Sequence, residues 1–154
     1  MIQISEYVLK QISLHAEREY PNEACGMIIG PIGKENAIGV FPIRNLQDEL
    51  HAKDPEKYSR TAKTAYYMDP EQQKIVEKEA ASKNFDLKAV YHSHPDHEVY
   101  FSEEDRLMAA PWGEPNHPHV SWIVISVKQG QAVGASEFFW EDEKKDYVEK
   151  RLKI

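Results

Sequence analysis

The sequence is poor in cysteine, in long hydrophobic runs and in positive charge. Its one cysteine, Cys25, excludes an intrachain disulfide and a four-cysteine zinc site, and it points weakly to the cytosol. No apolar run approaches the roughly 20 residues that cross a bilayer. The opening stretch MIQISEYVLKQ lacks the basic start and the long apolar centre of a signal peptide. We therefore expect a cytoplasmic protein that does not enter a membrane.

The charge balance argues against a nucleic-acid partner. The net charge is −7 and the chain shows no obvious basic cluster, whereas proteins that bind nucleic acids present a basic face. The length of 154 residues and the hydrophobic content of 41% suit one domain with one core. Because no linker, repeat or low-complexity segment divides the chain, we expect a single domain over residues 1–154.

Hydrophobic patterning predicts helices alternating with strands. Helices are expected after the capping residue Ser5 over 6–20, from Asp69-Pro70 to about residue 83, from Ser102 onward, and over the closing segment 141–154. Strands are expected at 24–30, at 37–45 with Pro42 at an edge or bulge, and at 64–69, 87–94, 119–127 and 132–140. The charged interval 47–62 lacks periodicity, which predicts a long loop and a candidate flap over a substrate. This order predicts an α/β protein with a central sheet and helices packed on it.

Two histidines lie at the end of the expected central strand. Residues two apart in an extended strand point to the same face, so His92 and His94 project together while Ser93 points away. Pro95 then ends regular pairing. Convergent imidazoles of this kind suit a metal ion such as zinc.

A second polar pair begins the next expected helix. Ser102 suits a helix cap, and the spacing Ser102-x-x-Asp105 is, by itself, a common capping box. Because it follows the two histidines after a short loop, Asp105 becomes a third candidate ligand. Two imidazoles and one carboxylate leave a fourth position open for water, as in catalytic zinc sites, whereas a closed structural site would need another protein ligand.

The run from His92-Ser-His94-Pro through six residues to Ser102-x-x-Asp105 resembles the metal motif of the JAMM (MPN+) metalloprotease family. That family also has a glutamate well upstream, and Glu23, directly before the apolar run ACGMIIG, stands at that place. The wording Glu-Ala-Cys-Gly is similar to that of small prokaryotic members. The resemblance implies a three-layer α/β/α architecture with a central mixed sheet, of the cytidine-deaminase-like JAMM/MPN type.

The resemblance also implies a chemistry. One Zn²⁺ would be bound by His92, His94 and Asp105, with a polarised water as the fourth ligand. Glu23 would hold that water and transfer its proton, and Ser102 would stabilise the developing negative charge or position Glu23. The implied activity is that of a zinc peptidase or isopeptidase acting at the C-terminus of a ubiquitin-like protein. For a small prokaryotic member, the implied substrate is a sulfur-carrier protein ending in Gly-Gly.

Several alternatives compete with this interpretation. A nucleophilic Cys25 is disfavoured by its apolar surroundings, and the second H-x-H pair, His117 and His119, has no acid at a useful spacing. His97 lies inside the motif's loop, but we do not expect it to be a ligand. A zinc deaminase would need a C-x-x-C arm, which a chain with one cysteine lacks. A non-catalytic MPN-type protein-interaction module is the alternative function, and the complete ligand set argues against it.

Overall fold

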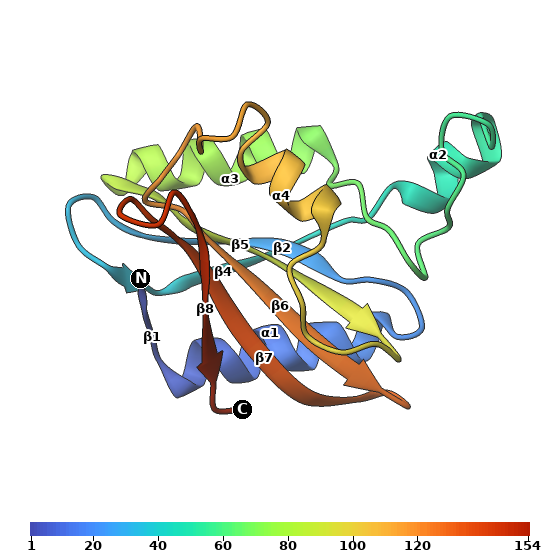
Figure 1. Ribbon diagram of the computed structural model, residues 1–154, viewed down its shortest axis with the longest axis horizontal. Helices are drawn as coiled ribbons and strands as arrows, with labels where there is room; N and C mark the ends of the chain where they lie inside the picture. Colours follow the sequence, from blue (N-terminus) through green and yellow to red (C-terminus); the bar gives the residue numbers. More distant parts are fainter.

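A six-stranded mixed sheet forms the middle of the molecule and carries helices on both faces (Figure 1). The computed structural model describes residues 1–154. The elements in chain order are β1 (Gln3–Ile4), α1 (Glu6–Glu19), β2 (Cys25–Pro31), β3 (Asn36–Ala37), β4 (Gly39–Ile43), α2 (Gln47–Lys53), α3 (Pro70–Ser82), β5 (Phe85–Pro95), α4 (Glu103–Ala109), β6 (Ser121–Lys128), β7 (Gln131–Glu141) and β8 (Asp146–Leu152).

The strand order of the large sheet is β4-β2-β5-β6-β7-β8, and β1 and β3 form a separate short pair. Within the large sheet, β5 and β6 run parallel and all other neighbours are antiparallel. β2 therefore begins beside the end of β5, where Cys25 pairs with His92. This topology brings the residues that precede β2 to the same end of the sheet as the last residues of β5.

Each face of the sheet has its own hydrophobic layer. On one face, α1 packs Ile12 and Ala16 into a cluster with buried residues of β5 and β6, among them Tyr91. On the other face, α3 packs Val76 and Ala80 against β2, and α4 lies beside an aromatic cluster. The buried members of that cluster are Phe101, Ala109, Trp122, Val124, Phe138 and Tyr147. The expected α/β/α arrangement with a mixed sheet is confirmed.

Three predicted helix starts, at Ser5, Asp69-Pro70 and Ser102, are confirmed, and each has its side-chain cap. The Ser5 hydroxyl accepts from the Val8 N–H at 3.2 Å, and the Asp69 carboxylate accepts from the Glu71 N–H at 3.0 Å. Such bonds satisfy N–H groups of the first turn that have no partner within the helix. Pro42 lies in β4, an edge strand as predicted. No helix combines the length and apolar character needed to span a membrane.

The prediction of a closing helix over 141–154 is wrong. β8 instead pairs antiparallel with β7 from Asp146 to Leu152. Tyr147 is buried there and its ring packs against Phe101 and Trp140. Pairing with β7 and burial of this one aromatic ring outweigh the helix propensity of the charged residues around it.

Two further predictions fail between β4 and α3. The interval 47–62 is not a continuous loop, because its first half forms α2, and the buried Gln47 donates from Nε2 to the Arg60 carbonyl at 2.9 Å. The strand predicted at 64–69 is reduced to one isolated bridge between Asn45 and Met68. The reason is local, since the Tyr67 N–H bonds to the Asn45 side chain at 3.0 Å instead of to a strand.

Candidate metal centre

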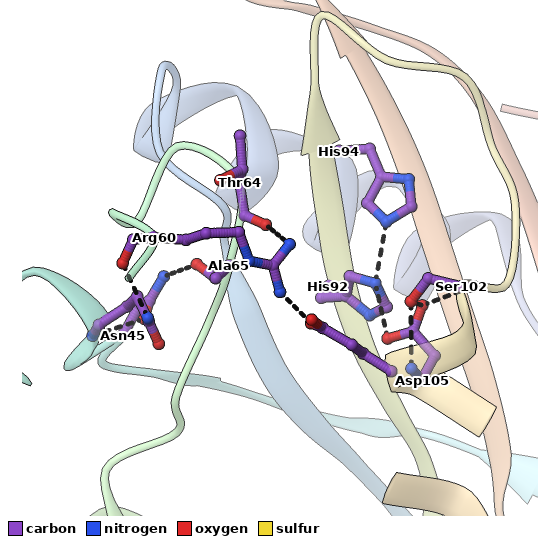
Figure 2. Close-up of polar contacts among 10 residues, drawn as sticks. Asn45, Arg60, Thr64, Ala65, His92, His94, Ser102 and Asp105 are labelled. Atoms are coloured by element: carbon purple, nitrogen blue, oxygen red, sulfur yellow. Dashed lines mark hydrogen bonds and ion pairs between the residues drawn. The ribbon is translucent and has the colours of Figure 1, made fainter. Parts of the chain in front are cut away.

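The two histidines of the motif project from the end of β5 on the same face of the sheet. Both are buried, and their Nε2 atoms lie 3.2 Å apart. Ser93 points to the opposite face, where its hydroxyl accepts from the Ala24 N–H at 2.8 Å. The alternation expected of an extended strand therefore places both imidazoles toward α4 (Figure 2).

Asp105 reaches the same point from the first turn of α4. Its Oδ1 lies 3.4 Å from His92 Nε2. Its Oδ2 accepts from the backbone N–H and the hydroxyl of Ser102 at 2.9 and 2.7 Å, and the Ser102 hydroxyl accepts in return from the Asp105 N–H at 3.1 Å. This reciprocal capping box fixes the carboxylate and leaves Oδ1 facing the histidines.

The donor set fits a divalent metal ion. One ligand atom from each of His92, His94 and Asp105 lies within 4.8 Å of the others. Nitrogen ligands about 2.0–2.1 Å from a tetrahedral ion stand about 3.3–3.4 Å apart, close to the spacing found here. His94 Nδ1 lies 3.0 Å from the Glu98 carbonyl. Nδ1 must therefore carry the proton, which leaves the Nε2 lone pair for a metal.

Burial and the charges of their neighbours shift the pKa values of all three candidate ligands. Burial, and then the neighbouring His92, lower the pKa of His94 to about 4, so that this ring is neutral at neutral pH. Burial opposes the ionised form of Asp105, but His92 and the Ser102 hydrogen bonds outweigh it and lower the pKa of Asp105 to about 2. Burial likewise opposes a charge on His92, but Asp105 and Glu23 outweigh it and raise the pKa of His92. A neutral imidazole and an ionised carboxylate are the forms that bind metals, so His94 and Asp105 are in the binding form, whereas His92 must release its proton when a metal binds.

Glu23 precedes β2 and lines the same cavity as the three candidate ligands. It is buried, and burial raises its pKa to about 7, with His92 acting in the opposite direction. Its backbone is held on both sides, because the Glu23 N–H donates to the Ala62 carbonyl at 2.6 Å and Asn45 Nδ2 donates to the Glu23 carbonyl at 3.0 Å. A buried carboxyl with such a pKa is suited to exchange a proton near neutral pH.

The cavity has a volume of about 280 Å³, and its lining also includes residues outside the motif. Arg60 and Tyr66 come from the segment between α2 and α3, and Tyr100 from the loop before α4. The Tyr66 ring stacks on His92 with centroids 4.6 Å apart, and the Tyr100 ring lies 4.6 Å from that of His94. No spacing rule marks these residues, because they lie in irregular segments whose course depends on tertiary contacts.

Other residues considered from the sequence have different surroundings. Cys25 is buried in an apolar cluster, and burial raises its pKa to about 12, which opposes a nucleophilic thiolate. His97 does not line the cavity, nor does its neighbour Asp96, which accepts from the Tyr20 hydroxyl at 2.7 Å and from the Gln129 N–H at 3.0 Å. His119 Nε2 lies 3.9 Å from Asp86 Oδ2, but His117, His119 and Asp86 do not bring three ligand atoms within 4.8 Å of one another, as the motif residues do.

The family assignment agrees with this geometry. A family model described as prokaryotic homologs of the JAB domain matches residues 5–141, which include all five motif residues and every element from α1 to β7. The chain belongs to this family. The resemblance to JAMM proteins noted from the motif is thereby confirmed at the level of the family. β8, which covers the edge of β7, lies outside the matched residues of this prokaryotic JAB-domain chain.

Curated relatives of this JAB-domain chain carry the name of a peptidase. Proteins named CysO-cysteine peptidase from Mycobacterium tuberculosis and Mycobacterium bovis are 26% identical to it over 114 residues. The matched region covers 74% of this chain and 65% of each relative. The chain thus spans just under two thirds of the length of these relatives.

Solved structures support the JAB-domain fold. A protein from Desulfitobacterium hafniense superimposes with a TM-score of 0.69 at 23% identity, covering 97% of this chain and 90% of the other. A protein from Salinibacter ruber gives 0.64 at 22% identity, covering 99% and 90%. A JAB1/MPN domain protein from Archaeoglobus fulgidus gives 0.54 at 16% identity, covering 96% and 93%. At these identities the likeness establishes the fold, and the chemistry must be argued from the residues themselves.

Proposed function

We propose that this JAB-domain chain is a zinc-dependent peptidase or isopeptidase that hydrolyses a bond at the C-terminus of a ubiquitin-like or sulfur-carrier protein. The observation that carries the proposal is the meeting of His92, His94 and Asp105 with the buried Glu23 in one cavity. Three ligands leave zinc an open position, and a nearby carboxyl provides the acid and base that hydrolysis needs. A module that only binds a partner needs neither an open metal position nor a nearby acid and base.

The three ligands and Glu23 divide the chemistry between them. A bound zinc ion would act as a Lewis acid and lower the pKa of water at its open position to about 7. Glu23 would take up a proton from the attacking water and return it to the leaving amine, since its own pKa of about 7 suits both transfers. Ser102 holds Asp105 through its only hydroxyl proton. To donate to the substrate's carbonyl oxygen instead, as the family resemblance implies, this hydroxyl would have to turn away from Asp105.

The substrate class is proposed from the relatives and from the cavity. The curated relatives are named CysO-cysteine peptidases, which supports a carrier protein that bears a cysteine or a short extension at its C-terminus. A Gly-Gly end would suit a cavity of about 280 Å³, because glycine has no side chain to obstruct the backbone. Arg60 of the 47–62 segment and Tyr100 of the 95–101 loop line this cavity, so we expect these two residues to contact such a tail.

The proposal is tested by measuring zinc and hydrolysis in the same preparations. Carrier proteins with C-terminal extensions are incubated with the wild type and with Glu23→Gln, and the products are identified by intact mass. We expect about one zinc per chain in both proteins, and a rate for Glu23→Gln that is lower by about 10²–10⁴-fold.

Glu49→Gln, an exposed change in α2, is the matched control and should keep both zinc and activity. A wild type without zinc, or a Glu23→Gln variant as fast as the wild type, would contradict the proposal. Tight binding of a carrier protein with no product would favour the interaction module instead.

A further inference from the structure

One cationic side chain lines the cavity of the candidate metal centre. Arg60 is the single lysine or arginine among the 13 lining residues, whereas four of them are carboxylates: Glu23, Glu103, Glu104 and Asp105. The metal ion of the proposed function would offset part of this negative charge, and Arg60 is the side chain of the lining that can attract a negatively charged substrate group. Arg60 is therefore the lining residue that can select for a charge on the substrate.

We propose that Arg60 binds the free α-carboxylate of the residue that leaves. The enzyme would then be a carboxy-terminal trimming peptidase, which removes a terminal residue and discriminates against bonds inside a longer chain and against lysine-linked branches. This inference rests on the proposed hydrolase function and specifies its substrate. Arg60 would determine which substrates are accepted, because it would contact the leaving residue without taking part in proton transfer.

The backbone around Arg60 is fixed to the segment before β2 that carries Glu23. The Arg60 carbonyl accepts from the buried Gln47 side chain at 2.9 Å. Two residues later, the Ala62 N–H donates to Asp48 at 2.7 Å and the Ala62 carbonyl accepts from the Glu23 N–H at 2.6 Å. The guanidinium is thus presented from a preorganised segment whose position is coupled to the proposed base.

The guanidinium itself is free to change partners. Its Nη1 donates to the Thr64 carbonyl at 2.8 Å and its Nη2 pairs with Glu104 in the first turn of α4. In Figure 2 it reaches from its loop toward the helix that holds Asp105. The Arg60 and Glu104 side chains are 44% and 65% exposed, and exposed ion pairs contribute little. A substrate carboxylate can replace Glu104 at small cost and accept two parallel N–H bonds, the geometry in which arginine is most selective.

The test compares two forms of one substrate. A carrier protein extended by a single alanine is prepared as the free acid and as the carboxamide; alanine is chosen because a cysteine thiolate would itself bind zinc. The wild type should hydrolyse the acid with a kcat/KM at least about tenfold higher than the amide, mainly through KM. Arg60→Met should abolish that preference by weakening the acid alone, and Arg60→Lys should restore part of it.

A binding measurement separates recognition from chemistry. Glu23→Gln, which is expected to turn over slowly, should bind the acid more tightly than the amide in calorimetry, and the double variant with Arg60→Met should bind both alike. Arg44→Met, which breaks a comparable exposed ion pair with Glu49 outside the cavity, is the control and should keep the preference.

The outcomes also distinguish this inference from the function on which it rests. Equal hydrolysis of acid and amide by the wild type, or an equal loss for both in Arg60→Met, overturns the inference and leaves the peptidase standing. Failure of the wild type to cleave either form, or any extended carrier, counts against the peptidase itself.

Discussion

The two oxygens of Asp105 face different partners. Oδ2 accepts from the N–H and hydroxyl of Ser102, and Oδ1 lies 3.4 Å from His92 Nε2. Helix capping and candidate metal ligation are therefore carried by one carboxylate. Because the capping box holds Asp105, the start of α4 and the metal centre should respond together to changes at either residue.

Asp105→Asn should remove the anionic ligand while keeping an oxygen that Ser102 can bond. Changes to residues that only support the ligands lower metal affinity by about 10–100-fold. Because Asp105 is itself a candidate ligand, we expect Asp105→Asn to lower the zinc affinity by more than this. The metal-free variant should remain folded, because the cap survives. Chelator competition and circular dichroism would check this, and a variant that retained full zinc affinity would remove Asp105 from the ligand set.

Ser102→Ala should lower the zinc affinity less than Asp105→Asn does, and it should also lower the stability of the fold. Loss of the cap should lower the free energy of unfolding by about 1 kcal/mol. Loss of the bond to Asp105 Oδ2 should lower zinc affinity by about 10–100-fold. Urea unfolding of the metal-free protein and chelator competition measure the two effects separately. A stability loss with unchanged zinc affinity would show that the capping box does not orient the carboxylate.

Burial of Glu23 should make the metal-free protein less stable as the pH rises. Its pKa is about 7 in the fold and 4.5 in the unfolded chain, so the folded state binds a proton that the unfolded state releases between these values. Stability therefore falls with rising pH across that window. Glu23→Gln does not titrate, and its advantage in free energy of unfolding should grow between pH 4.5 and 7 to about 3 kcal/mol at most, then level off. Urea unfolding after chelator treatment checks this, and an advantage that does not vary with pH would contradict it.

Asn45 should contribute to stability and hydrolysis because it holds the backbone on either side of the candidate site. Its Nδ2 donates to the carbonyls of Glu23 and Ala65, and its Oδ1 accepts from the N–H groups of Gln47 and Tyr67. Asn45→Ala leaves these groups without partners and should cost about 1–3 kcal/mol of stability. Hydrolysis should fall while zinc remains bound.

The control for this change is Asn36→Ala, an exposed asparagine whose side chain bonds only to Gln3. It should leave unfolding in urea and hydrolysis close to those of the wild type. If both alanine variants behaved alike in these assays, Asn45 would have no special part in holding the site.

Gly26 should tolerate no side chain. A Cβ at this position would overlap the ring of Tyr91, which is fully buried and whose hydroxyl lies 2.9 Å from His15 Nδ1. Because the ring has no free space to move into, Gly26→Ala should destabilise the protein by about 1–3 kcal/mol. In Gly134→Ala the nearest side-chain atom lies at 3.6 Å, and this variant should be close to neutral. Thermal unfolding compares the two.

Local patterns were sufficient to bring the three candidate ligands together. His92 and His94 obey the two-residue alternation of a strand, and Ser102 and Asp105 obey the three-residue spacing of a capped helix start. Both rules depend on neighbours in the chain, so the sequence alone predicts them. Glu23 follows no such local rule and was proposed through a family resemblance; the antiparallel pairing of β2 with β5 brings it to the same end of the sheet as the candidate ligands.

Tertiary contacts decided what the sequence did not predict. Arg60 is placed by the side chains of Gln47 and Asp48 and by the backbone before β2, none of which forms a regular pattern with it. The prediction of a closing helix over 141–154 was wrong for a related reason. Its composition favours a helix, but an edge of β7 was available for pairing and Tyr147 could be buried, and both depend on residues far away in the chain.

The two edge strands of the sheet also affect whether two molecules of the protein can associate through their sheet edges. β4 contains Pro42, which supplies no N–H for a further strand, and β8 presents the exposed charged residues Glu149, Lys150 and Arg151. A neighbouring molecule that approached either side would find a missing donor or a row of charges. Both edges thus disfavour extension of the sheet, and we expect concentrated solutions to resist edge-to-edge aggregation.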